Sequence, residues 1–283
     1  MDQASRRSAA TTTPLWRDSR AKRLLAAFTY PIFYLLNRPA FQGLNNVIYD
    51  FALRCNGIAI NFKGSRGLTV GEERFLQCYL PRSSGALFDV GANHGAYARV
   101  LHAFAPQAPI YAFEPHPRTF AHLQATCMLP NVTLVNQAMG GRDGTMTLFD
   151  MAADDGSTQA SLSRDAVAMF SKDVVEHAIT CTTFDGFVEQ HGIGQVALLK
   201  IDTEGHDLDV LKGASRAIAA KRIRAIQFEF IPANIATHVS MRDFFDALPG
   251  YRLHRLCMNG GLLPLPKQPY SACRTDAAFG ALC

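Results

Sequence analysis

The chain has 283 residues, enough for one large domain or for a domain with an extension, and 48% of them are apolar and 18% charged. That composition is typical of a folded protein and excludes a disordered, collagen-like or coiled-coil chain. The formal net charge of +4 is concentrated at the N-terminus, because residues 1–38 hold seven basic and two acidic side chains and the rest of the chain holds 21 basic and 22 acidic ones. A body without excess positive charge is not expected to bind nucleic acid.

Residues 24–36 form an apolar run of thirteen residues that follows the basic segment. Spanning a bilayer takes about 20 apolar residues, and Pro31 would kink a helix at this point, so a transmembrane helix is not expected. Two interpretations stay open. The run is either a helix that covers one end of the main core, or an interfacial segment of residues 1–38 that rests on an anionic membrane with Tyr30, Phe33 and Tyr34 at headgroup level. The basic, acid-poor start at residues 4–23 also resembles an organellar transit peptide.

The chain has an odd number of cysteines, and they are widely scattered. No two of them form a C-x-x-C pair, and no histidine follows them at metal-ligand spacing. We therefore expect reduced thiols in a cytoplasmic protein, with peripheral membrane association as the alternative that the N-terminal segment raises. The seven are Cys55, Cys78, Cys127, Cys181, Cys257, Cys273 and Cys283.

From residue 85 onward, short apolar runs alternate with helical stretches. This alternation is typical of an α/β fold, a doubly wound and mostly parallel sheet with helices on both faces. The predicted strands are 87–90, 110–114, 132–138, 197–202 and 225–230, and the predicted helices are 96–104, 118–126, 208–220 and 241–248.

Two further segments depart from this alternation. Residues 140–183 contain turn residues, a strand-like stretch at 146–149 and a polar stretch at 154–159, which indicate an insertion of the kind that often covers a site. Residues 251–256 and the Gly- and Pro-rich tail suggest closing strands in a hairpin. We expect a basic tail and helical extension over residues 1–65 and a main domain over residues 66–283, with its core motifs at 85–240.

The first motif follows the predicted strand at 87–90 and opens a helix, and it reads G-x-N-x-G from Gly91 through Asn93 to Gly95. Glycine lets the backbone approach a ligand closely, and a helix N-terminus offers free N–H groups. A dinucleotide fingerprint would need glycine at position 93 and at Ala96, so a dinucleotide is not favoured. Asp89 in the preceding strand would repel a pyrophosphate and suits a cationic or zwitterionic ligand.

Glu114 follows 25 residues after Asp89, at the end of the next predicted strand. An acid in this position can accept both hydroxyls of a ribose, as in other nucleotide-binding α/β folds. A ribose without a phosphate and a cationic centre near Asp89 together describe S-adenosylmethionine.

With these motifs the chain resembles the FkbM-type methyltransferases, a family of class I S-adenosylmethionine-dependent methyltransferases. The resemblance covers about residues 66–240, and the segments that carry it are FDVGANHGAYA at 88–98, FEPHP at 113–117, NQA at 136–138, TFD at 183–185 and LKIDTEGHDLDVLKGA at 199–214. It implies a Rossmann-like sheet of seven strands, S-adenosylmethionine as methyl donor, and O-methylation of a hydroxyl on a sugar, glycolipid, polyketide or other secondary metabolite. The cofactor-binding residues expected on this basis are Asp89, Gly91, Asn93, Gly95, Glu114, Asn136, Gln137 and Asp202.

The second motif places acids and a histidine where the predicted strand 197–202 ends, at the edge where open α/β sheets bind ligands. Methyl transfer to an alcohol needs an in-line approach and a group that takes the hydroxyl proton. The candidate catalytic residues are Asp202, Glu204 and His206. Asp207 and Asp209 are favoured in the first turn of a helix by its dipole, so we assign them no catalytic role. No metal is expected, because the spacing of these acids matches no metal signature.

Other residues are weaker candidates for lining the acceptor pocket, namely Glu229 at the end of strand 225–230, His94 and residues 157–162. The acceptor is expected to be a small molecule or glycan with a hydroxyl group. The alternatives are N-methylation or a dinucleotide-dependent reaction on the same fold, and a catalytically inactive, membrane-associated binding module. The sequence does not indicate an oligomeric state.

Overall fold

The computed structural model describes residues 20–60, 62–265 and 277–282, and it describes side chains between Leu25 and Leu265. Residues 1–19 of the basic tail, Cys273 and Cys283 lie outside the described residues. The chain divides into two compact units, Met1–Leu53 and Arg54–Cys283. Residues 54–65, expected in the N-terminal extension, are part of the second unit. The guanidinium of Arg255 donates to the carbonyl of Asn56 at 2.8 Å and joins this segment to the end of the main sheet.

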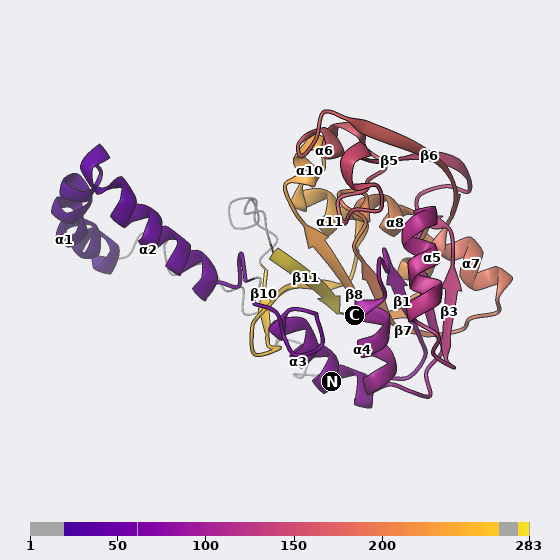
Figure 1. The fold of residues 1–283 in the computed structure, drawn as a ribbon. Helices are drawn as coiled ribbons and strands as arrows, with labels where there is room; N and C mark the ends of the chain where they lie inside the picture. Colours follow the sequence, from indigo (N-terminus) through magenta and orange to yellow (C-terminus); the bar gives the residue numbers. More distant parts are fainter. Residues whose placement is uncertain (1–19, 61, 266–276, 283) are drawn as a thin grey trace, which may run out of the picture. The chain divides into compact units, whose positions relative to one another are not determined.

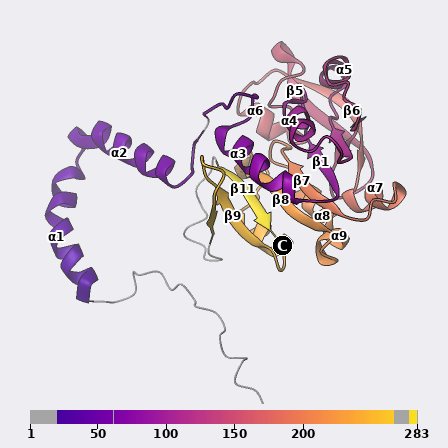
Figure 2. The same ribbon diagram turned by 90° about the horizontal axis from the view of Figure 1, so that it is seen from below.

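The first unit is helical (Figures 1 and 2). Its elements are α1 (Arg20–Leu36), the short 3-10 helix η1 (Pro39–Phe41) and α2 (Gln42–Cys55), whose last two residues belong to the second unit. Pro31 lies inside α1 without ending it. Among the described residues, no helix combines the length and the apolar character needed to cross a membrane.

The second unit is built on a sheet of eight strands in the order β10-β9-β11-β8-β7-β1-β2-β3 (Figure 1). Neighbours from β8 to β3 pair in parallel, while β11, β9 and β10 pair antiparallel. The mostly parallel α/β sheet is as expected, but the number of strands is not seven, because residues 262–264 add a hairpin strand outside β9. The strands are β1 (Ala86–Val90), β2 (Ile110–Phe113), β3 (Val132–Val135), β7 (Val196–Ile201), β8 (Ile223–Phe230), β9 (Arg252–Leu256), β10 (Leu262–Pro264) and β11 (Ala277–Leu282).

Helices cover both faces of this sheet. Neighbouring residues of a strand point to opposite sides, so apolar side chains on both faces are buried against them. Leu87 packs in a buried cluster with Leu76 and Leu101. The next residue, Phe88, contacts Phe184 on the other face, with the ring centroids 4.9 Å apart. The helical elements of this unit, apart from the insertion, are α3 (Val70–Tyr79), η2 (Leu80–Arg82), α4 (Ala96–Phe104), α5 (Pro117–Thr126), α7 (Phe184–Gln190), α8 (Asp207–Gly213), α9 (Ser215–Ala219), α10 (Ala233–Ala236) and α11 (Met241–Ala247).

The predicted insertion forms a second, three-stranded sheet in the order β4-β6-β5. Its core contains Leu148, Ile179 and Cys181, all buried. The predicted strand 132–138 is therefore divided, since its first residues belong to the main sheet and its last to this one. The elements are β4 (Ala138–Met139), β5 (Gly144–Met151), η3 (Ala152–Asp154), α6 (Arg164–Ala168) and β6 (Val174–Thr182).

The predicted helix 208–220 is also divided, into α8 and α9. The buried carboxylate of Asp185 accepts from the backbone N–H groups of Arg216 and Ala217 at 2.8 and 2.9 Å. This carboxylate satisfies donors at the start of α9 that a continuous helix would have bonded internally. The TFD segment that resembles the family thus has a structural use here, because Asp185 joins α7 to α9.

Candidate active site

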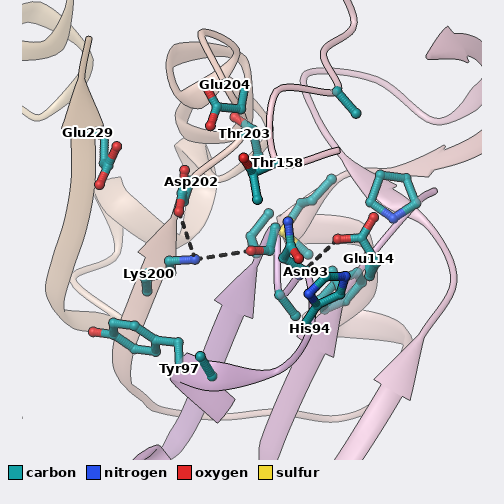
Figure 3. A pocket seen from close by; sticks show the side chains of 18 of the residues that line it. Asn93, His94, Tyr97, Glu114, Thr158, Lys200, Asp202, Thr203, Glu204 and Glu229 are labelled. Carbon is teal, nitrogen blue, oxygen red and sulfur yellow. Dashed lines mark hydrogen bonds and ion pairs between the residues drawn. The ribbon is translucent and has the colours of Figure 1, made fainter. Parts of the chain in front are cut away.

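A cavity of about 540 Å³ lies at the carboxyl ends of β1, β2, β7 and β8 (Figure 3). Parallel α/β sheets bind their ligands at this edge, where the strand-to-helix loops converge. The β1–α4 loop, the end of β2, the segment after β7, the insertion and residues 63–72 all contribute to its wall. The polar side chains that line it are Lys63, Thr69, Glu72, Asn93, His94, Tyr97, Glu114, Gln137, Ser157, Thr158, Ser161, Lys200, Asp202, Thr203, Glu204 and Glu229.

The β1–α4 loop is held close to both neighbouring strands. Gly91 has a positive φ of 76°, and a Cβ atom at this position would lie 1.8 Å from the carbonyl oxygen of Asp202. Only glycine fits there, because β1 and the end of β7 approach so closely. Asn93 is also left-handed, with a φ of 48°, and its N–H donates to Glu114 at 2.9 Å. The loop therefore presents Gly91 and Asn93 to the cavity.

Glu114 is the buried acid at the end of β2, and both of its carboxylate oxygens are oriented by backbone donors. One oxygen accepts from Asn93 N at 2.9 Å and the other from His116 N at 2.8 Å. Burial raises the pKa of Glu114 to about 7, although both N–H donors oppose the shift. Each oxygen keeps a second lone pair, so the fixed carboxyl group can accept two hydroxyls of a ligand.

The remaining residues of the predicted cofactor site divide into two groups. Gln137 lines the cavity. Gly95 and Asn136 do not line it. Gly95 directly precedes α4, and the amide of Asn136 donates to the carbonyl of Glu114 at 2.8 Å. Asn136 thus supports the loop that carries Glu114 and does not face a ligand.

Asp89 also lies away from the cavity, which corrects the expectation that it meets a cationic ligand. It is fully buried, and Lys200 of β7 pairs with it at 3.0 Å. The same ammonium lies 3.4 Å from Asp202 and donates to the carbonyl of Gly91 at 3.1 Å. Burial lowers the pKa of Lys200, but attraction to Asp89 and Asp202 outweighs it and holds that pKa above its usual range. The sequence alone indicates no role for Lys200.

Asp202 and Glu204 line the cavity directly after β7 (Figure 3). The side chain of Asp202 is one-third exposed. Burial, and then repulsion from Asp202 and Asp207, raises the pKa of Glu204 to about 8. Glu229 at the end of β8 faces the same space, and repulsion from Asp202 together with burial raises its pKa well above the usual range. The cavity therefore contains two carboxyl groups with raised pKa values, Glu204 and Glu229, beside Asp202, which is paired with a cation.

His206, the third candidate catalytic residue, does not line the cavity. It precedes α8, and its Nδ1 atom lies 3.2 Å from the carboxylate of Asp209. Asp207 does more than interact favourably with the helix dipole. Its buried carboxylate accepts from Thr203 N at 2.9 Å and from Glu229 N at 2.9 Å. This buried carboxylate joins the loop after β7 to the end of β8 and fixes the position of Glu204 between them.

The insertion covers part of the cavity and is tied to its wall by polar contacts. Ser161 Oγ donates to the carbonyl of Glu204 at 2.8 Å. Asp155 accepts from two imidazoles, at 3.0 Å from His116 and 2.6 Å from His177, and from Arg118 at 3.1 Å. We call Asp155 and these three partners the Asp155 clasp. It holds the insertion against the segment that follows Glu114.

The ligand atoms of His116, Asp155 and His177 lie within 4.8 Å of one another, which is the spacing of a metal site. Among the described residues this group, and not Asp202, Glu204 and His206, has such geometry. However, Nδ1 of His116 accepts from the N–H groups of Arg118 and Thr119 at the start of α5. Its hydrogen is then on Nε2 and points to Asp155, so hydrogen bonding accounts for the cluster.

A hydrogen-bonded network at the opposite wall was not foreseen. Tyr97 donates to the side-chain oxygen of Gln227 at 2.7 Å, and the Gln227 amide donates to Glu72 at 2.8 Å. Glu72 also caps α3 through Thr69. The pattern of residues 63–72 does not indicate a site. A polar residue such as Gln227 inside a buried strand indicates that a hydrogen-bond partner must lie nearby.

The chain is similar to known methyltransferases. Residues 89–253 match the family model described as the methyltransferase FkbM domain. Hexuronic acid methyltransferase AglP of Haloferax volcanii is 28% identical over 152 residues, which cover 52% of this chain and 58% of that protein. The 2-O-methyltransferase NoeI of Sinorhizobium fredii is 22% identical over 184 residues, which cover 62% of this chain and 75% of NoeI. The match to AglP thus spans less than two thirds of that relative. The crystal structure of methyltransferase FkbM from Methylobacillus flagellatus aligns with a TM-score of 0.42 at 16% identity, over 70% of this chain and 43% of that one.

Proposed function

The chain belongs to the FkbM methyltransferase family, and from that premise we propose that it transfers a methyl group from S-adenosylmethionine to a hydroxyl oxygen of a glycan or other small molecule. The observation that carries the proposal is the pair of oriented oxygens of Glu114 beside the close-fitting loop at Gly91 and Asn93. A ribose diol matches those oxygens, and the loop offers no nest of glycines for a pyrophosphate. NoeI is a 2-O-methyltransferase, and this supports oxygen as the atom that is methylated.

The charges in the cavity and directly behind its wall fit this donor. Asp89, Asp202 and Lys200 together have a net charge of −1 when the two acids are ionised, so the buried lysine does not leave a positive site beside a sulfonium. When bound, S-adenosylmethionine supplies a methyl carbon already activated by the positive sulfur. The protein then has to bind the adenosine, align an acceptor oxygen and take up a proton.

We assign the proton-accepting role to Glu204. Its pKa of about 8 makes it a stronger base than an ordinary carboxylate, and still leaves part of it ionised at slightly alkaline pH. Its backbone is left-handed, with a φ of 49°, and Ser161 and Asp207 hold the segment in place. Asp202 is paired with Lys200 and is assigned to orienting ligands, as is Glu229 for the acceptor.

Calorimetric titration of the full chain with S-adenosylmethionine and S-adenosylhomocysteine tests the donor. We expect both to bind, and Glu114→Gln to weaken binding by about tenfold or more, because an amide leaves one backbone N–H without an acceptor. The matched control is Glu176→Gln, since Glu176 is exposed and its carboxylate pairs only at the surface with Arg164. Binding of neither ligand by the wild-type chain would contradict the proposal.

Incubation with methyl-labelled donor and a panel of hydroxyl-bearing saccharides then tests the acceptor. Label on an oxygen of the product is the expected result. Label on nitrogen would replace O-methylation by N-methylation, and donor binding without transfer to any substrate would favour an inactive binding module.

A further inference from the structure

The first unit has two helices whose apolar side chains are exposed. In α2, Leu44, Val47, Ile48 and Phe51 recur at helical spacing and form one stripe. All four are between 49% and 68% exposed, and no residue of α2 is buried. An amphipathic helix normally buries such a stripe against a core, so its exposure indicates a surface that something else covers.

The same holds for α1. Twelve of the nineteen large apolar side chains that are exposed in the described residues lie between residues 25 and 51, and the others are scattered over residues 62–263. Tyr30 and Tyr34 stack on the α1 surface, with centroids 6.4 Å apart, and the Arg38 guanidinium lies 5.5 Å from the Tyr34 ring centroid. The α1 members are Leu25, Phe28, Tyr30, Ile32, Phe33, Tyr34 and Leu35, and those of α2 are Leu44, Val47, Ile48, Tyr49 and Phe51.

The net positive charge of the protein comes entirely from this unit. Residues 1–53 contain seven basic and three acidic side chains, whereas residues 54–283 contain 21 of each. The entire formal charge of +4 therefore belongs to the segment that carries the exposed apolar side chains. Apolar side chains with tyrosines on a positively charged segment are the combination that anionic lipid surfaces select.

We propose that α1 and α2 lie in the interface of an anionic membrane, with their apolar side chains inserted between headgroups and the basic residues of this unit attracted to the lipid charge. Neither helix is long and apolar enough to cross a bilayer, which fits helices that lie along its surface. A second copy of the chain is a poorer partner for this surface, because two segments of like charge repel each other. The inference does not depend on methyl transfer.

Vesicle co-sedimentation of the full chain tests it, with phosphatidylcholine vesicles compared with vesicles that also contain phosphatidylglycerol. We expect binding to the anionic vesicles that weakens as salt is added. The double variant Val47→Asp/Phe51→Asp should bind these vesicles at least about tenfold more weakly, because two inserted side chains are replaced by charges. Both positions are exposed, so the variant is expected to fold, which circular dichroism checks.

The matched control is Met128→Asp, an 84% exposed apolar residue of the second unit, which should bind like the wild type. Equal sedimentation of the wild type with neutral and anionic vesicles would overturn the proposal, as would wild-type binding by the double variant. A dimer in solution that the double variant abolishes, without any vesicle binding, would assign the surface to a second copy instead.

Discussion

Lys200 is a buried cation that lies between two carboxylates, and its removal would leave Asp89 without a countercharge in the core. Lys200→Met should lower the free energy of unfolding by about 3–5 kcal/mol, the usual cost of leaving one partner of a buried ion pair unpaired. Lys212→Met is the control, because Lys212 pairs with Asp209 on the surface and such pairs contribute about 0–1 kcal/mol. Urea unfolding of both variants measures the difference, and equal losses would show that the buried pair is unimportant.

Glu204 gives a prediction about pH. A protonated carboxyl cannot take up a proton, and the folded-state pKa of Glu204 is raised to about 8, so kcat should increase as pH rises through about 8 and level off above it. Glu204→Gln should lower kcat by about 10²- to 10⁴-fold and remove this limb of the profile. A profile of kcat between pH 6 and pH 10 is the measurement.

Asp202→Asn is the comparison for that experiment. It should fold and lose most methyl transfer through poor orientation of ligands. The residual kcat should still rise with pH, but at a lower pH than in the wild type, because repulsion from Asp202 contributes to the raised pKa of Glu204. If Glu204→Gln keeps both the full kcat and the rise of kcat with pH, Glu204 is not the base.

At the residue scale, the sequence pointed to the loop at Gly91, to Glu114 and to the acids after β7, and all of these line the cavity. It failed where the direction of a side chain decides the role. Asp89 lies inside its strand, directly opposite Lys200 in the register of β1 and β7. Two opposite charges inside neighbouring apolar strands should have indicated an internal pair, since an unpaired buried charge is costly. Nothing in the local pattern could show that His206 lies beside Asp209 and outside the cavity.

At the scale of elements, the Asp155 clasp joins the insertion to the segment after Glu114. Burial opposes ionisation of Asp155, but hydrogen bonds from His177, Arg118 and His116 lower its pKa to about 2. The Asp155 carboxylate is therefore ionised at neutral pH. Asp155→Asn would weaken these bonds and loosen residues 157–162 over the cavity. We expect about three- to tenfold weaker binding of S-adenosylmethionine by calorimetry.

The neighbouring Asp154 offers a matched control, because it is exposed and ends the 3-10 helix η3 one residue before Asp155. Asp154→Asn should bind the donor like the wild type. Equal affinities for the two variants would mean that the clasp does not contribute to the cavity.

Elements with a clear local pattern of apolar residues were predictable from the sequence. Elements whose ends depend on contacts with residues far along the chain were not. Strands β1, β2 and β7 are near-continuous apolar runs, as is typical of buried parallel strands. The break between α8 and α9 depends instead on the carboxylate of Asp185, some thirty residues away in the chain. The division between β3 and β4 likewise depends on pairing with β6, which no local pattern contains.

At the scale of the whole molecule, the sequence located the positive charge at the N-terminus and predicted a near-neutral body. The structure makes the division sharper, because the second unit is neutral and begins at Arg54, not at residue 66. The twelve residues between were unpredictable from composition, since Asn56 and Gly57 join the second unit through contacts with Arg255 on β9, far along the chain.

This division predicts that a chain beginning at Arg54 folds and binds S-adenosylmethionine as the full chain does. Every buried apolar side chain in the described residues lies between Ile58 and Leu256, so the truncation removes none of the core. Its thermal midpoint should stay within a few degrees of the full-length value, because about 1 kcal/mol shifts the midpoint of a domain of this size by only about 2–4 °C. Leu76→Ala in the full chain is the comparison, since loss of this fully buried side chain should cost about 2–5 kcal/mol. A truncated chain that is less stable than Leu76→Ala, or that binds the donor more than about tenfold more weakly, would mean that the first unit is part of the catalytic fold and that its exposed apolar side chains have a partner within the chain.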